Sequence, residues 1–207
     1  MNTDAMSYDF GCDSLSPSGA PVPGFRVLVV CTGNLYRSPL AECLLRHRLR
    51  EARRVIRLSS AGTRALPGKP MAATIESFLL GRGAPPSGTG SHRLTKELVD
   101  GSDLVLGAAT EHREAAVRLS PVRALSRAFT LGEFVRLMRT EDAAGVVDPA
   151  ARFAALVQGA AARRGAAGVR ADDDVEDPLG APPQQVRECL ARIEEAVERI
   201  AAAVLIG

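Results

Sequence analysis

The sequence predicts an α/β protein in which an open sheet of about four parallel strands carries helices on both faces, in three layers. Two observations lead to this prediction. Short apolar runs typical of buried strands alternate along the chain with segments of helical periodicity. Such alternation implies right-handed crossovers and therefore parallel strands. The chain has 207 residues, of which 46% are hydrophobic and 24% charged, which is enough for one domain with a core.

The first strand and helix flank a short polar loop. Residues 25–30 form a continuous β-favouring run, as expected for a central strand buried on both faces. Ser38 is predicted to cap the next helix and Pro39 to occupy its first position. That helix presents an apolar face made by leucines at helical spacing: Leu40, Leu44, Leu45 and Leu49.

The rest of the chain continues the alternation. Strands are predicted at 55–60, 103–108 and 127–131. Helices are predicted at 70–82, 95–99, 110–119, 133–139, 149–164 and 182–206. Residues 1–24 mix polar residues, Gly and Pro without periodicity, and we expect a disordered tail there. The predicted domain therefore spans residues 25–207.

Composition argues against several classes of partner. The net charge is only +2 and aromatic residues are 4% of the chain, with no Trp, so we expect no nucleic-acid partner. No apolar run approaches the length that crosses a bilayer, and no signal peptide is evident, so we expect a cytoplasmic protein without membrane insertion. The four cysteines are scattered, with neither metal-ligand spacing nor a disulfide framework, so neither a metal nor another cofactor is predicted.

The polar loop after the first strand has the features of a phosphate-transfer site. Cys31 and Arg37 lie six positions apart, with Thr32, Gly33 and Asn34 between them. A loop between a strand and a helix N-terminus can converge its N–H groups on an anion, and Arg37 adds a planar fork of donors. The same positive potential favours the thiolate form of Cys31, a nucleophile. Asn34 is expected to adopt the left-handed backbone conformation.

These residues carry a resemblance to a known family. The segment Cys31-Thr-Gly-Asn-Leu-Tyr-Arg37-Ser38-Pro39 resembles the signature of the low-molecular-weight protein tyrosine phosphatases, which have the phosphatase I-like fold. A similar loop occurs in thioredoxin-coupled arsenate reductases. Ser60-Ala-Gly-Thr63 resembles the family's second marker and Glu176-Asp177-Pro178 its third. All three occur in the family's order.

The resemblance assigns roles to the marker residues. Cys31 would form a phosphocysteine intermediate, and Asp177 would protonate the leaving group and later activate water. Asp148, which also precedes a proline, is a rival for this acid, although a plain helix cap explains it as well. Ser38 would donate to the sulfur, and Ser60 would hold Asn34. Substrate contacts are predicted for the loop residues Thr32, Gly33, Asn34, Leu35, Tyr36 and Ser38, together with Arg37.

The chain also departs from the family pattern. Residues 140–174 form an apparent insertion, either a lid or partner surface at the rim of the site or an extra helix on the surface. Leu179 replaces an aromatic residue that usually walls the phenol slot, which could relax selectivity for phosphotyrosine. Tyr36 replaces a second cysteine, so oxidation of Cys31 should be less reversible. His92 is off the spacing of the family's supporting histidine by about three positions and is not assigned a role.

The predicted function is a metal-free phosphatase acting on phosphotyrosine in proteins, with a tyrosine kinase as one candidate partner. An arsenate reductase would need further cysteines to pass a disulfide outward, and none lies between Cys43 and Cys189. A non-catalytic phosphate-binding or interaction module is the alternative of a different class. It would keep Arg37 and have no need of Cys31 or the acid.

Overall fold

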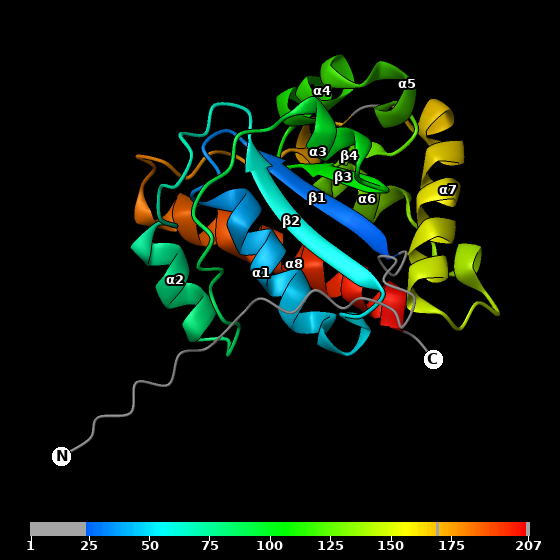
Figure 1. Ribbon diagram of the computed structural model, residues 1–207, viewed down its shortest axis with the longest axis horizontal. Helices are drawn as coiled ribbons and strands as arrows, with labels where there is room; N and C mark the ends of the chain where they lie inside the picture. Colours follow the sequence, from blue (N-terminus) through cyan, green and yellow to red (C-terminus); the bar gives the residue numbers. More distant parts are fainter. Residues whose placement is uncertain (1–23, 169, 206–207) are drawn as a thin grey trace, which may run out of the picture.

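The computed structural model describes residues 24–168 and 170–205, and the predicted tail lies outside the described residues except for Gly24. Four strands form one parallel sheet: β1 (Phe25–Cys31), β2 (Ile56–Gly62), β3 (Leu104–Gly107) and β4 (Ala128–Thr130) (Figure 1). The strand order is β2-β1-β3-β4, with β1 in the centre. The predicted parallel α/β sheet is confirmed.

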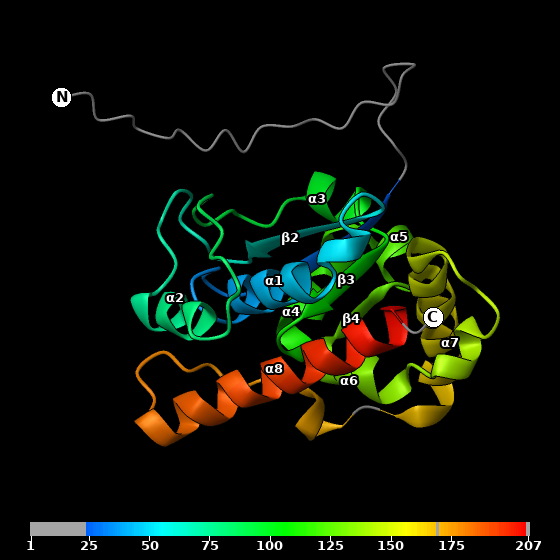
Figure 2. The ribbon, with the colours of Figure 1, turned by 90° about the horizontal axis from the view of Figure 1, so that it is seen from below.

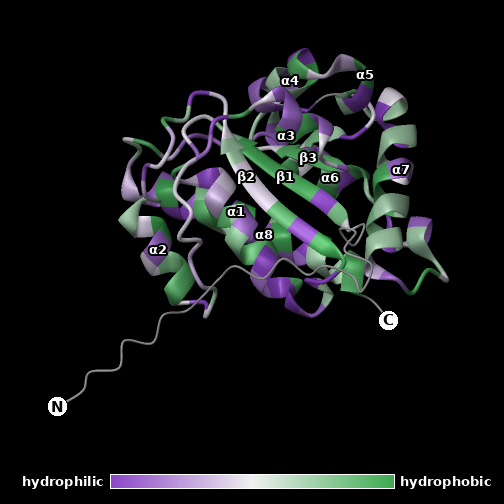
Figure 3. Ribbon diagram, viewed as in Figure 1, coloured by the Kyte–Doolittle hydropathy of each residue, from purple (hydrophilic) through white to green (hydrophobic). Residues whose placement is uncertain are grey.

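Helices cover both faces of the sheet. Alternate residues of β1, such as Val27 and Val29, pack with α1 (Arg37–Arg48), α6 (Leu131–Leu137) and α8 (Pro183–Leu205). Helices α1 and α8 lie side by side (Figure 2). The opposite face, with Leu28 and Val30, packs with α3 (Lys96–Asp100), α4 (Thr110–Leu119) and α5 (Pro121–Ala124). Both faces of β1 are buried, and the strand is mostly hydrophobic (Figure 3).

Shorter elements complete the chain. Helix α2 (Ala73–Leu80) packs beside α1. The 3-10 turns are η1 (Arg50–Ala52), η2 (Thr140–Ala143) and η3 (Ala171–Asp173). No helix within the described residues is both long and apolar enough to span a membrane.

One cap prediction is wrong. Helix α1 begins at Arg37, after Tyr36, so Ser38 lies inside its first turn and does not cap it. The side chain of Ser38 is fully buried, with 0% exposure, and its hydroxyl points toward Cys31. The Ser38 hydroxyl therefore contacts the Cys31 sulfur and does not cap the helix N-terminus as the sequence suggested.

The apparent insertion contains a helix that belongs to the core. Phe153 of α7 (Pro149–Ala167) stacks on Phe25, at the amino end of β1, with ring centroids 4.7 Å apart. Arg152 is buried and donates to the carbonyls of Ala143, Val146 and Ala203. Cys31 is at the opposite end of β1, so the first of the two alternatives, a lid or partner surface at the rim of the site, does not hold for α7. Its apolar face, including Phe153, is buried instead.

Candidate active site

The phosphate loop, residues 31–38, connects the carboxyl end of β1 to the start of α1. Cys31 is the last residue of β1 and Arg37 the first of α1, so both are fixed by regular structure. Asn34 has φ of 56°, which confirms the predicted left-handed conformation. Ligands bind at the carboxyl ends of strands in open parallel sheets, and the loop lies at that edge.

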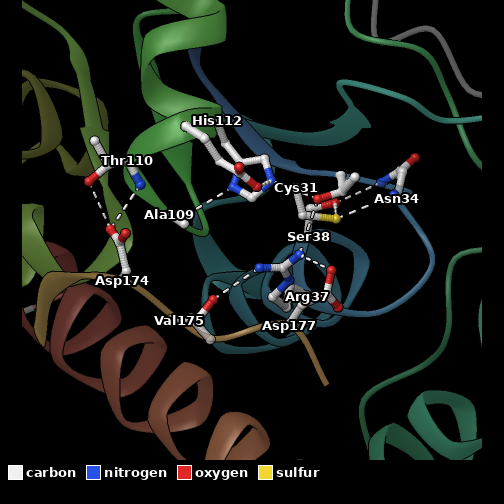
Figure 4. A network of polar contacts seen from close by, with 12 residues as sticks. Cys31, Asn34, Arg37, Ser38, Ala109, Thr110, His112, Asp174, Val175 and Asp177 are labelled. Atoms are coloured by element: carbon white, nitrogen blue, oxygen red, sulfur yellow. Dashed lines mark hydrogen bonds and ion pairs between the residues drawn. The ribbon is translucent and has the colours of Figure 1, made fainter. Parts of the chain in front are cut away.

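Two hydrogen-bonding groups contact the sulfur of Cys31. The Asn34 N–H lies 3.3 Å from Sγ and the Ser38 Oγ lies 3.0 Å from it (Figure 4). The Asn34 side-chain amide donates to the Ser38 Oγ at 2.9 Å, so the single Ser38 hydroxyl proton can point to the sulfur or to the Ala61 carbonyl. The carbonyl of Ala61 accepts at a longer 3.3 Å. Because a thiolate cannot donate, Ser38 must be the donor when Cys31 is ionised.

A second layer of hydrogen bonds holds the loop from behind. Asn34 Nδ2 donates to Ser60 Oγ at 2.8 Å, and Ser60 donates to Glu42 Oε2 at 2.5 Å. Glu42 is buried and also pairs with Arg46 one turn along α1. The Asn34 Oδ1 accepts the backbone N–H of His92 at 2.8 Å. Ser60 therefore contacts Asn34 as predicted, whereas His92 contributes its backbone and its ring makes no hydrogen bond within the described residues.

Gly62 explains why the second marker contains a glycine. A Cβ at this position would lie 2.6 Å from the carbonyl oxygen of Thr32 and 2.9 Å from the nitrogen of Asn34. The carboxyl end of β2 therefore lies directly against the phosphate loop. Any side chain there would displace the loop.

Arg37 joins the phosphate loop to a distant segment, residues 174–180, which we call the acid loop. Its guanidinium is only 5% exposed and donates to the Val175 carbonyl at 3.0 Å and to Thr32 Oγ1 at 3.2 Å. The same group pairs with Asp177 Oδ2 at 2.6 Å. Asp177 is 48% exposed, beside solvent. The structure thus brings Asp177 to Arg37 across 140 residues of sequence.

Asp148, the rival acid, lies elsewhere. Its carboxylate accepts the Ala151 N–H at 2.8 Å and caps α7. This contact is the ordinary helix cap that also explained the Asp-Pro pair in the sequence.

His112, in the first turn of α4, had no role predicted from the sequence. Its ring is 1% exposed; Nδ1 accepts the Ala109 N–H at 3.0 Å, and Nε2 lies 3.0 Å from Thr32 Oγ1. Burial, followed by the charge of Arg37, lowers the pKa of His112 to about 4, so the ring is neutral at pH 7. Nε2–H therefore donates to Thr32. A histidine in a helix that starts at the carboxyl end of β3 was the available signal.

The acid loop is anchored at one end by Asp174, which had no predicted role. Its Oδ1 accepts the N–H and the hydroxyl of Thr110 at 2.8 and 3.0 Å. The Val175 N–H donates to the Ala108 carbonyl at 2.7 Å. Asp174 and Val175 therefore dock the loop beside β3 and the start of α4.

The remaining predicted substrate contacts vary in exposure. Gly33, Leu35 and Tyr36 are half-buried, and Tyr36 packs against the core. Leu179 is 71% exposed, and Leu66 is 65% exposed.

The other cysteines in the described part of the chain are buried. Cys43 and Cys189 are free thiols, and burial raises the pKa of Cys189 to about 11. Cys12 lies outside the described residues. No cluster of three or more His, Cys, Asp or Glu side chains within the described residues could hold a metal ion.

The fold and the loop define a class: an α/β protein with a cysteine and an arginine in one anion-binding loop at the carboxyl edge of a parallel sheet. The family model described as "Low molecular weight phosphotyrosine protein phosphatase" matches residues 26–157. The chain belongs to this family, which confirms the resemblance seen in the sequence.

Relatives in the family act on two kinds of phosphorylated residue. The low molecular weight protein-tyrosine-phosphatase Etp of Escherichia coli K12 is 36% identical over 95 residues, which cover 46% of this chain and 62% of Etp. The match thus spans less than two thirds of that relative. A protein-arginine-phosphatase of Geobacillus stearothermophilus is 26% identical over 177 residues, covering 86% of this chain and 94% of that protein.

A solved structure shows the same fold. The low molecular weight protein tyrosine phosphatase from T. tengcongensis superposes with a TM-score of 0.62 and 26% identity, covering 85% of this chain and 97% of that chain.

Proposed function

We propose that this chain is a protein tyrosine phosphatase that forms a phosphocysteine intermediate on Cys31. The observation that carries the proposal is the pairing of Asp177 with Arg37, because it supports an acid at the mouth of the loop that holds the nucleophile. Arg37 and the loop amides would bind the phosphate. The thiolate supplies the nucleophile and Arg37 the charge stabilisation, so the proposed reaction needs no metal.

The first step transfers the phosphoryl group to the enzyme. Sγ of Cys31 attacks phosphorus, the bond from phosphorus to the tyrosine oxygen breaks, and the carboxyl of Asp177 protonates that oxygen as it leaves. Bound phosphate would take over the donors of Arg37 that Asp177 now occupies, which would leave Asp177 free to face the leaving group. The charge that develops on the three phosphoryl oxygens meets Arg37 and the loop N–H groups.

The second step releases phosphate. The carboxylate of Asp177 takes a proton from water, the water oxygen attacks phosphorus, and the phosphorus–sulfur bond breaks. The departing thiolate receives the hydrogen bond of Ser38, whose Oγ lies 3.0 Å from the sulfur. The N–H of Asn34 is the second donor to that sulfur.

A phosphoarginine phosphatase is the second candidate. Its support is the long match to the Geobacillus stearothermophilus protein-arginine-phosphatase. Exposed Leu179, two residues after Asp177, and half-buried Leu35 in the loop favour the tyrosine ring instead. A phosphorylated guanidinium carries N–H groups that need acceptors, which leucines do not offer.

An arsenate reductase and a non-catalytic binding module have less support. Passage of a disulfide outward, as in arsenate reduction, is disfavoured by the burial of Cys43 and Cys189. A non-catalytic module would have no use for both a cysteine in the loop and an acid beside it.

The test is metal-free hydrolysis of an aryl phosphate, a phosphotyrosyl peptide and a phosphoarginyl peptide by wild type and Cys31→Ser. We expect turnover of the aryl phosphate and the phosphotyrosyl peptide, and we expect Cys31→Ser to abolish both while still binding an oxyanion. Turnover that survives in Cys31→Ser would refute the mechanism. A higher kcat/KM for the phosphoarginyl peptide would select the second candidate. Oxyanion binding without any turnover by wild type would favour the binding module.

A further inference from the structure

A cleft of about 570 Å³ opens beside the phosphate loop and is not used by the proposed chemistry. It begins at Thr32, the neighbour of Cys31, and is bounded by Thr63 after β2 and by α4. We call it the arginine cleft, because its charged lining residues are Arg64, Arg93, Arg118 and Glu111. Neither Asp177 nor another residue of the acid loop lines it.

The charges of the cleft are not balanced within it. Three arginines face one carboxylate, and that carboxylate, Glu111, lies 3.2 Å from His112 Nε2. Arg118 is 3.7 Å from Glu114 and 68% exposed, a weak pair. Within the described residues, the side chains of Arg64 and Arg93 make no ion pair or hydrogen bond. A surface with three like charges around one cavity has a potential that attracts anions.

The backbones of the two unpaired arginines are fixed. The Arg64 N–H donates to the Thr32 carbonyl at 2.9 Å, which ties its turn to the phosphate loop. Arg93 forms a parallel bridge with Gly62, the glycine packed against the same loop. Both guanidinium groups therefore extend into the cleft from rigid backbone positions beside the phosphate loop. They can be oriented toward a ligand at little cost in backbone entropy.

The cleft also has apolar lining. Leu94 is 8% exposed and Leu119 37%, and Ala115 also lines the cleft. An apolar floor with an arginine rim suits a peptide whose backbone and carbon atoms rest on the floor while acidic groups meet the rim. A bare inorganic anion would leave most of the volume unused.

We propose that the arginine cleft binds the segment of the phosphoprotein that flanks the phosphorylated residue, and that it selects segments with anionic side chains. The anion can be a carboxylate or a second phosphate, since both accept from guanidinium groups. This inference rests on the proposed function, because it gives that function its substrate preference. Thr32 connects the cleft to the candidate active site, because it lines the cleft and its Oγ1 accepts a hydrogen bond from Arg37 Nη2 at 3.2 Å.

The experiment compares kcat/KM for three phosphotyrosyl peptides of equal length at low salt. One has Gln on both sides of the phosphotyrosine, one has Glu, and one has a second phosphotyrosine. The enzymes are wild type, Arg64→Gln/Arg93→Gln, and the matched control Arg53→Gln/Arg54→Gln. The control removes two exposed arginines just before the amino end of β2, away from the cleft.

We expect wild type and the control to prefer the Glu peptide over the Gln peptide by about fivefold, and the cleft variant to lose that preference. If kcat/KM rises more for the doubly phosphorylated peptide than for the Glu peptide, relative to the Gln peptide, the anion that the cleft selects is a phosphate. If kcat/KM rises only for the Glu peptide, that anion is a carboxylate. Equal kcat/KM for the Gln peptide and both anionic peptides in wild type, or a preference that survives in the cleft variant, would overturn the inference.

Two further measurements distinguish a failure of the cleft inference from a failure of the proposed phosphatase activity. Hydrolysis of a small aryl phosphate, which does not reach the cleft, should be equal in all three enzymes and reports on the proposed function alone. Differences in affinity among the three peptides, measured in the Cys31→Ser background, report on the cleft, because the phosphate loop binds a phosphotyrosine in each of them. Affinities that do not differ between the Gln peptide and the anionic peptides would reject the cleft even if every peptide were hydrolysed.

Discussion

The phosphate loop and the acid loop meet at Arg37, yet they are built differently. In the phosphate loop Cys31, Asn34 and Ser38 are 2%, 3% and 0% exposed, and side chains of β2 and α1 hold them from behind. In the acid loop Asp177 and Leu179 are exposed, and the side chain of Asp177 meets only Arg37 and the Leu179 N–H within the described residues. The acid loop is anchored mainly at Asp174 and Val175.

The difference matches the two proposed tasks. A nucleophile and its anion site work best when their donors are oriented before the substrate arrives. An acid must give way to the substrate and then approach the leaving group, so a loop with few contacts suits it. Four variants test this comparison, from the largest expected effect to the smallest.

Arg37→Lys should have the largest effect, because Arg37 serves both loops. A lysine has no planar fork and cannot reach Val175, Thr32 and Asp177 together. We expect kcat/KM for an aryl phosphate to fall by about 10³-fold. Arg54→Lys, an exposed change far from the site, is the matched control. A loss below about tenfold would mean that Arg37 is not the main phosphate ligand.

Asp177→Ala should separate the function of the acid loop from that of the phosphate loop. With a poor leaving group we expect kcat to fall by about 10²-fold or more, and with an activated aryl phosphate by much less, because only the poor leaving group needs a proton. Asp148→Ala should leave both rates unchanged and lower the free energy of unfolding by about 1 kcal/mol, since it removes the α7 cap. If Asp148→Ala selectively slows the poor leaving group instead, Asp148 is the acid.

His112, which contacts Thr32 of the phosphate loop, should make the stability of the protein depend on pH in the acid range. Its pKa is about 4 when folded, below its ordinary value of 6.5, so the unfolded chain binds more protons between these values. Stability should therefore fall as pH drops from about 6.5 to about 4, by up to about 3 kcal/mol. A protonated Nδ1 would also face the Ala109 N–H, which it now accepts.

Urea unfolding of wild type and His112→Asn at several pH values measures this effect. The difference in unfolding free energy between the two should shrink as the pH falls through that window. A difference that stays constant with pH would contradict the lowered pKa of His112. The control variant is His47→Asn, which changes a histidine in the last turn of α1.

Asp174→Ala should have the smallest effect, because it loosens the acid loop without touching the reacting atoms. We expect kcat with a poor leaving group to fall by up to about tenfold and oxyanion affinity to stay unchanged. Asp172→Ala, an exposed neighbour, is the control. A matching loss of oxyanion affinity would mean that the two loops are coupled more tightly than their contacts suggest.

Much of the fold was predictable, because its signals are local. Helix α4 spans 110–119 as predicted, and the strands differ from prediction mainly at their ends. Helix α5 was missed because four residues give no measurable periodicity. The cap assigned to Ser38 was wrong because a buried sulfur competed for its hydroxyl.

The sequence by itself determined the phosphate loop. Cys31, Asn34 and Arg37 lie within seven residues, where a strand, a left-handed turn and a helix start fix their relation, so short-range geometry is enough. Only the tertiary structure decided what surrounds that loop. It placed Asp177 on Arg37, His112 against Thr32, and Arg64 and Arg93 around one cleft, because these residues are far apart in the sequence and meet only when the parallel strands align their carboxyl ends.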